Sequence, residues 1–132
     1  MRRELSMLPL NKIEYTKTKE TIYVKSVEKI SCVNSAAFVM GFSIYYLDEE
    51  TGETKAAGWT SGNYPVGQER TCDLAKDAPE IPDGAIVWAH VHAVLGKSND
   101  GTPKLKKDSK NGQVGTYRVT GTTLIYDVKL IG

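Results

Sequence analysis

Cysteine and histidine are scarce in this chain, which contains only two of each among its 132 residues. Cys32 and Cys72 are too few for the disulfide framework of a small secreted domain. They are interpreted either as buried thiols or as one disulfide, and the sequence leaves that pairing open. No zinc-type spacing of cysteines and histidines occurs, so no metal and no other cofactor is predicted.

An excess of one charge is also lacking, because 17 Lys and Arg face 16 Asp and Glu. Nucleic-acid-binding domains usually carry a basic surplus, so no nucleic-acid partner is predicted. No apolar run reaches the roughly 18 residues of a membrane-spanning helix, and none is expected. Glu4, Ser6 and Pro9 interrupt the apolar run that a signal peptide needs near the amino terminus, so no cleavable signal peptide is predicted. Localisation stays open between the cytoplasm and export without such a signal.

Helical periodicity is weak, and alternation of apolar and polar residues takes its place. Residues 37–47 show it most clearly, with Phe38, Met40 and Phe42 on one face. In residues 22–33 the alternation slips near Ser26, which predicts a bulge. Further strands are predicted over 54–60, 68–74, 85–95, 113–120 and 122–131, where Leu95 is assigned to a core face and Leu124 shares a face with Tyr126. One helical turn is expected around residues 74–78.

About seven strands separated by turn signals predict an all-β protein. The expected architecture is a single antiparallel β-sandwich, with a small closed β-barrel as the alternative. Residues 1–20 are interpreted as an N-terminal arm or edge strand, and residues 21–132 as the sandwich domain.

Both histidines lie in one predicted strand, at positions 90 and 92. Side chains two residues apart on a strand share a face and lie about 7 Å apart, which suits two imidazoles on one metal ion. Gly84, six positions before the His-X-His pair, resembles the first half of the cupin signature. The likeness covers nine residues, and neither the following glutamate nor a third histidine is present. It implies, as one alternative, a small cupin-like metal enzyme that uses His90 and His92.

The face of that strand with Trp88, His90 and His92 is too apolar for a surface in contact with water. Strands that are apolar on both sides are usually covered on both sides. The cover is expected to be another part of the chain, a second subunit or a ligand. This face therefore predicts, as an alternative function, a structural or assembly protein that forms a homo-oligomer through Trp88, His90 and His92.

Flat aromatic side chains also flank a turn, where Trp59 and Tyr64 stand on either side of Asn63. Such rings stack against sugars, so Trp59, Asn63 and Tyr64 are the predicted ligand-binding residues. Residues 96–112, the Lys-rich segment, contain five lysines and are interpreted as a solvated loop.

Motifs of catalysis are missing, including a Gly-rich phosphate loop and a Gly-X-Ser-X-Gly elbow. The sequence therefore predicts a non-enzymatic binding module. Carbohydrate or cell-surface recognition, in the manner of lectin-like or toxin-like β-sandwiches, is the expected function.

Overall fold

The computed structural model describes residues 12–15 and 20–132. In those residues the chain forms twelve strands and one short helix. In chain order they are β1 (Lys12–Tyr15), β2 (Glu20–Tyr23), β3 (Ser26–Val27), β4 (Lys29–Asn34), β5 (Met40–Asp48), β6 (Glu53–Thr60), β7 (Glu69–Asp73), α1 (Leu74–Asp77), β8 (Ile86–Ala93), β9 (Ser98–Asp100), β10 (Leu105–Lys107), β11 (Val114–Gly121) and β12 (Tyr126–Leu130).

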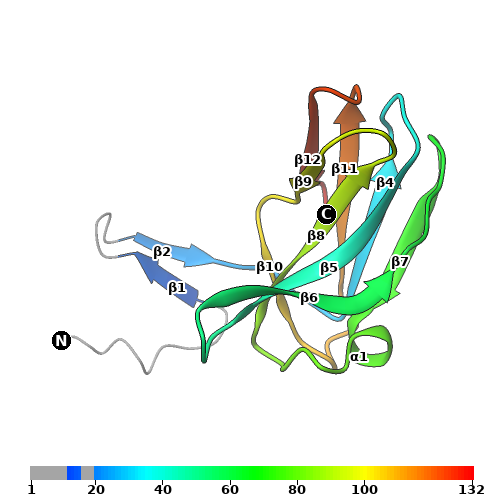
Figure 1. Cartoon of the computed structure of the whole chain (residues 1–132). Coiled ribbons are helices and arrows are strands. Elements are labelled where there is room, and N and C mark those ends of the chain that lie inside the picture. The colour runs from blue at the N-terminus through cyan, green and yellow to red at the C-terminus, as the bar shows by residue number, and fades with distance from the viewer. Residues whose placement is uncertain (1–11, 16–19) are drawn as a thin grey trace.

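The strands form two large sheets and one hairpin (Figure 1). The larger sheet has the order β3-β10-β8-β5-β6, and β9 pairs with β8 beside β10. The smaller sheet has the order β12-β11-β4-β7, and β1 pairs with β2 separately. The all-β prediction is confirmed, and two separate sheets with edge strands replace the single closed barrel.

Both large sheets are mixed, which corrects the prediction of an antiparallel sandwich. β4 pairs in parallel with β11, and β3 pairs in parallel with β10, while the other pairings are antiparallel. The predicted strand 22–33 is in fact divided, because β3 joins the larger sheet and β4 the smaller one. The slip near Ser26 therefore marks the place where the chain crosses between sheets, not a bulge within one strand.

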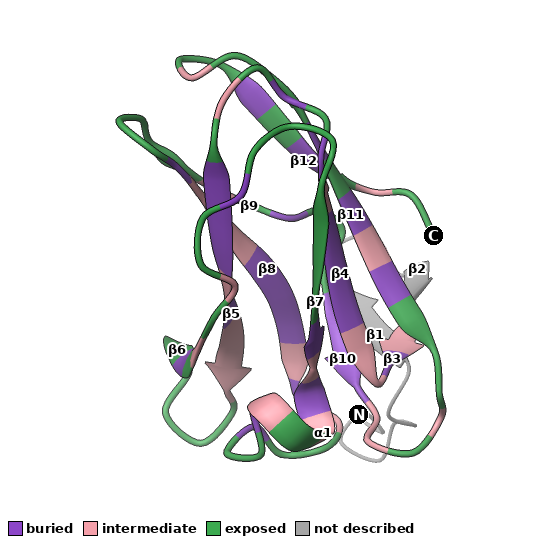
Figure 2. Ribbon diagram, turned by 90° about the vertical axis from the view of Figure 1, so that its right-hand side faces the viewer, coloured by how far each residue is buried: buried purple, intermediate pink, exposed green. Residues whose placement is uncertain are grey.

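The core lies between the two large sheets (Figure 2). Strands β5 and β8 bury one face each, and β4 and β11 bury theirs from the other side. The fully buried apolar side chains on these four strands are Ile30, Cys32, Met40, Phe42, Ile44, Val87, Ala89, Val91, Tyr117 and Val119. Burying aliphatic and aromatic surface on this scale is the main contribution to the stability of the fold.

The expected helical turn is present as α1. The Asp73 side chain accepts hydrogen bonds from the main-chain N–H groups of Ala75 and Lys76, which caps the amino terminus of the helix. Pro79 follows two residues after Asp77, and a proline cannot continue the helical hydrogen bonding.

The Lys-rich segment is not a solvated loop, since it contains β9 and β10. Leu105 lies in the core, and Lys106 and Lys107 are buried beside it. The Lys107 Nζ donates to the carbonyl oxygens of Ala78 and Ile81 over 3.1 and 2.6 Å. This ammonium group therefore holds the chain between α1 and β8 against the larger sheet.

Residues 1–11 and 16–19 of the predicted N-terminal arm lie outside the described residues. The described part of the arm contains β1, which pairs with β2. Lys12 lies opposite Tyr23 in this pair, and Tyr15 lies opposite Glu20. The division into an arm of residues 1–20 and a domain of residues 21–132 stays a prediction.

Candidate functional site

Four turns meet at one end of the molecule, which is uppermost in Figure 1. They comprise residues 35–39, 61–67, 94–96 and 121–125, and we call this surface the loop end. Main-chain hydrogen bonds join the turns: Ala37 N donates to Gly121 O over 3.0 Å, and Val94 N donates to Val39 O over 2.9 Å. Gly67 N donates to the carbonyl oxygen at the end of β4. Turns that are distant in sequence thus form one continuous surface.

The loop end contains no charged residue. The turns at the opposite end are rich in charge, as in residues 48–53 and 108–113. Exposed aliphatic side chains gather on the loop end instead: Val39, Val66, Val94, Leu95, Leu124 and Ile125. The other two exposed large aliphatic side chains in the described residues, Val114 and Ile131, lie elsewhere. An exposed apolar patch of this kind usually marks an interaction site.

Leu95 is the most exposed of these side chains, with 97% of its surface exposed. Its backbone has a φ of 62°, in the left-handed region that favours glycine. The neighbouring Gly96 is required for a steric reason, because a Cβ there would lie 2.5 Å from the Thr123 Cγ2 atom. The chain thus places a leucine, in an unfavourable backbone conformation, entirely in solvent. Such strain is typical of functional positions.

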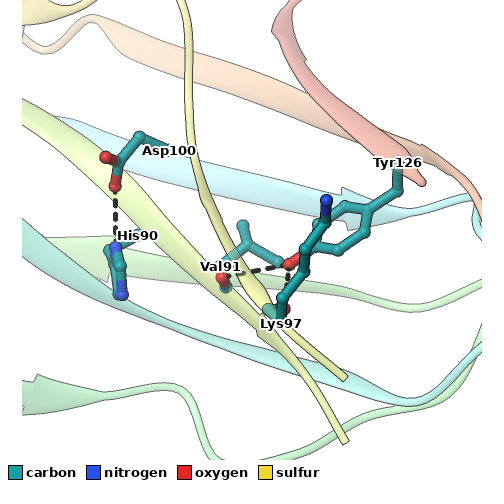
Figure 3. A network of polar contacts seen from close by, with 5 residues as sticks. All are labelled: His90, Val91, Lys97, Asp100 and Tyr126. Carbon is teal, nitrogen blue, oxygen red and sulfur yellow. Dashed lines mark hydrogen bonds and ion pairs between the residues drawn. The ribbon is translucent and has the colours of Figure 1, made fainter. Parts of the chain in front are cut away.

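We call Leu95, Leu124 and Ile125 the tip of the loop end. Tyr126 anchors the turns behind this tip (Figure 3). Its hydroxyl donates to the main-chain oxygens of Lys97 and Val91, over 2.5 and 3.3 Å. Its ring meets the Phe38 ring edge-on, with centroids 4.9 Å apart. Asn99 Nδ2 donates to the Tyr126 carbonyl oxygen over 2.6 Å. Three of the four turns therefore share one buried anchor.

Sequence reasoning missed the tip of the loop end. It placed Leu95 on a core face and Leu124 on a strand face with Tyr126, but Leu124 is 79% exposed and Ile125 76%. The reason is that β8 ends at Ala93 and β12 begins at Tyr126, so both leucines belong to turns. The sequence signal that could have indicated this surface is the absence of charged residues from the four turns of the loop end.

The predicted ligand-binding residues do not form one exposed rim. Tyr64 is buried, with 1% of its surface exposed, and its hydroxyl donates to the Cys32 carbonyl oxygen over 2.7 Å. Trp59 is half-buried and packs edge-on against Phe42, with centroids 5.2 Å apart. Asn63 is exposed at the loop end. The Tyr64 ring therefore has no free face for a sugar, whereas Asn63 is accessible.

Other parts of the chain cover Trp88, whereas His90 and His92 on the same face are only half-buried. Trp88 is only 4% exposed, and the Lys104 ammonium group lies 4.2 Å from its ring centroid. Tyr45 packs beside Trp88 and stacks on His90 with centroids 4.0 Å apart. Asp100 on β9 approaches His90 Nδ1 to 2.7 Å (Figure 3). The Lys-rich segment thus provides part of the cover, while a role of this face in assembly stays a prediction.

His92 lies one step further along the same face, opposite Gly41 in β5. Burial, and then the nearby His90, lower the pKa of His92 below its ordinary value. Within the described residues, no three His, Cys, Asp or Glu side chains lie together so that they could hold a metal ion. The cupin-like alternative therefore has no third ligand in that part of the chain.

Cys32 and Cys72 are both free and buried. Burial raises the pKa of each thiol to about 12, so both are in the neutral form at ordinary pH. They serve as small apolar side chains in the core.

No helix in the described ranges is long and apolar enough to cross a bilayer. No family model matches the sequence, and neither does any curated protein.

Solved structures of bacterial toxins show a distant similarity to this chain. The membrane-binding domain of pneumolysin is 15% identical, with a TM-score of 0.45 over 79% of this chain and 95% of that domain. Listeriolysin O is 13% identical, with a TM-score of 0.44 over 85% of this chain and 23% of the toxin. A mutant of intermedilysin, solved with human CD59, is 14% identical, with a TM-score of 0.44 over 85% of this chain and 25% of that one. The chain thus spans about a quarter of listeriolysin O and of intermedilysin. At these values the likeness carries no conclusion about function.

Proposed function

We propose that this chain is a non-enzymatic cell-surface-binding module that docks on a lipid surface through its loop end. The observation that carries the proposal is the gathering of six exposed aliphatic side chains on four turns without a single charge. The proposal rests on this geometry and not on the distant similarity to toxins.

The energetics of such docking are favourable because no charge has to leave water. Transferring the side chains of Leu95, Leu124 and Ile125 into hydrocarbon contributes about 1.5–3 kcal/mol each. The total is on the order of 5 kcal/mol, similar to that of a single acyl anchor, which gives reversible binding. Lys97 follows the tip and is exposed, so its ammonium group can stay at the level of the headgroups.

The shape of the tip also suits a bilayer. The side chains stand on turns held from behind by Tyr126, so little order has to be gained on binding. The charged turns lie at the other end of the long strands, away from the lipid.

Flotation with phosphatidylcholine vesicles tests the proposal. Wild-type protein should rise with the vesicles, and Leu95→Asp should stay at the bottom of the gradient. Ile131→Asp is the matched control, because Ile131 is an exposed aliphatic residue outside the loop end. A wild-type protein that does not rise, or equal behaviour of the two variants, would contradict the proposal.

Carbohydrate recognition is the second candidate function. It is favoured by one specific observation, the polar surroundings of Asn63 at the loop end. Assembly through Trp88, His90 and His92 receives less support, because one chain already buries Trp88.

A further inference from the structure

The larger sheet has an open edge at β6 (Figure 1). β6 is the last strand of this sheet, and the four residues at its start are all exposed. A strand at the edge of a sheet presents unpaired main-chain N–H and C=O groups, which can pair with a strand of another chain. We call these four residues, Glu53, Thr54, Lys55 and Ala56, the free edge.

Thr54 and Ala56 direct their main-chain N–H and C=O groups away from the sheet. Along a strand, successive residues bond to opposite neighbours. Val94 N donates to Val39 O at the start of β5, so odd-numbered residues of β5 bond towards β8 and even-numbered residues towards β6. These even-numbered residues lie opposite the odd-numbered residues of the free edge. Thr54 and Ala56 therefore have no bond to β5, and no other described group bonds to their main chain.

The free edge also carries a charge without a counter-ion. Glu53 lies directly opposite Asp48, and like charges in such a position destabilise a sheet. Lys55 Nζ lies 2.7 Å from Asp48 Oδ2 and so neutralises the aspartate. In the described residues, no ion pair includes Glu53. A second cation beside Glu53 would therefore stabilise this part of the sheet.

A second copy of this chain supplies that cation when two free edges pair antiparallel. With Thr54 opposite Thr54 of the second copy, Glu53 of each chain lies opposite Lys55 of the other. Opposite charges in directly facing positions stabilise a strand pair, and this arrangement contains two such pairs. A register centred on Glu53 or on Lys55 would instead place like charges opposite each other. The charge pattern therefore favours the symmetric pairing centred on Thr54.

Glu80 closes the same edge further along β6. Its Oε2 atom accepts a hydrogen bond from Gly58 N over 2.9 Å, so this outward N–H group is occupied within the chain. A pairing centred on Ala56 would place Thr54 opposite Gly58 and would need that N–H group. Glu80 therefore restricts pairing to the free edge.

The strands at the edges of the smaller sheet are less open. Thr102 lies along β12, where its N–H group donates to Val128 O over 3.0 Å and its carbonyl oxygen accepts from Leu130 N over 2.9 Å. At the end of β7, the Asp77 side chain accepts from Asp73 N over 2.9 Å. Side chains and loops of the same chain thus occupy groups on both of these edges.

We propose that the free edge of β6 is a self-association surface, on which two copies of this chain form a symmetric dimer with reciprocal ion pairs between Glu53 and Lys55. The contact is short, so the dimer is weak and forms as the protein concentration rises. The dimer does not depend on lipid docking, because the free edge begins at the end of the molecule opposite the loop end.

Sedimentation equilibrium of the full chain at low ionic strength tests the proposal, since salt screens exposed ion pairs. Wild-type protein should dimerise at concentrations below about 1 mM. Glu53→Lys should weaken the dimer at least tenfold, because it places two lysines opposite each other twice. Asp127→Lys is the matched control: it makes the same change of charge at an exposed position on β12 and should leave the dimer unchanged.

Mixing two variants gives the sharpest readout. Glu53→Lys and Lys55→Glu should each be largely monomeric alone, because each places like charges opposite each other in its own dimer. In an equimolar mixture, both facing pairs become opposite in charge, so a heterodimer at least as tight as the wild-type dimer should form. A surface ion pair without strand pairing would not need main-chain groups, whereas Thr54→Pro, which removes the outward N–H group, should abolish the dimer.

Leu95→Asp separates this dimer from association through the apolar loop end. It should abolish vesicle binding and keep the wild-type dimer, so the two proposals can fail separately. A wild-type protein that stays monomeric up to about 1 mM, a dimer that is lost in Leu95→Asp, or a mixture of the two charge variants that stays monomeric would each overturn the proposal.

Discussion

The Tyr126 hydroxyl donates to the Lys97 carbonyl oxygen over 2.5 Å, although the two residues stand 29 positions apart. This bond joins the start of β12 to the turn between β8 and β9. The apolar tip of the loop end is built on these two segments. Its shape therefore depends on one buried phenol.

Tyr126→Phe should lower the free energy of unfolding by about 1–2 kcal/mol, because two main-chain oxygens lose a hydrogen-bond donor. Urea denaturation measures the loss, and hydrogen exchange should quicken in residues 94–97. Tyr46→Phe is the control, since the Tyr46 hydroxyl has no hydrogen-bond partner in the described residues. Equal stability of the two variants would show that the bond does not anchor the turn.

Leu95→Gly should separate stability from binding. Glycine adopts a φ of 62° without strain, which offsets its greater freedom in the unfolded chain. The free energy of unfolding should therefore change by less than about 1 kcal/mol, while flotation with phosphatidylcholine vesicles weakens. Loss of stability beyond that range would mean that Leu95 is a structural residue.

Lys107→Met should lower the free energy of unfolding by about 2–3 kcal/mol. The change removes a charged donor and leaves the buried carbonyl oxygens of Ala78 and Ile81 without their bonds. Thermal or urea unfolding measures the effect, with the exposed Lys110→Met as control. A loss below 0.5 kcal/mol, on the scale of surface substitutions, would contradict the role given to this ammonium group.

Acid should destabilise the protein through His92. The pKa of His92 in the folded chain is lowered from 6.5, so the unfolded chain binds the proton more readily. The stability from this group is present above about pH 6.5 and is lost as the pH falls below that value. In His92→Gln, the difference in stability between pH 7.5 and pH 5.5 should shrink. An unchanged pH dependence would indicate that His92 is not desolvated.

Local alternation was enough to predict most of the strands. The strand predicted over residues 37–47 is present because Met40, Phe42 and Ile44 face the core, while the residues between them do not. The parallel pairing of β4 with β11 could not be predicted, because it joins segments about 85 residues apart that carry no local signal. For the same reason, the division at Ser26 resembled a bulge.

The candidate site was only partly predictable. Asn63 and His92 were singled out for different roles, and the structure brings them together around Gly41. Tyrosine is a residue type expected at a binding rim, yet the Tyr64 hydroxyl donates a hydrogen bond to the Cys32 carbonyl oxygen inside the core. Lys104 covers Trp88 from a segment whose charge suggested a free loop. Such contacts depend on tertiary pairing and not on sequence spacing.

The depth of the loop end in a bilayer tests the central claim most directly. A fluorescent thiol label fits this test, because the native thiols Cys32 and Cys72 are buried with a pKa of about 12. The label is placed in Leu95→Cys, or in Glu50→Cys at the turn between β5 and β6 at the opposite end. With phosphatidylcholine vesicles, lipid-borne quenchers should quench the label at position 95 and leave the label at position 50 in water. Equal quenching at both positions, or none at position 95, would contradict the account.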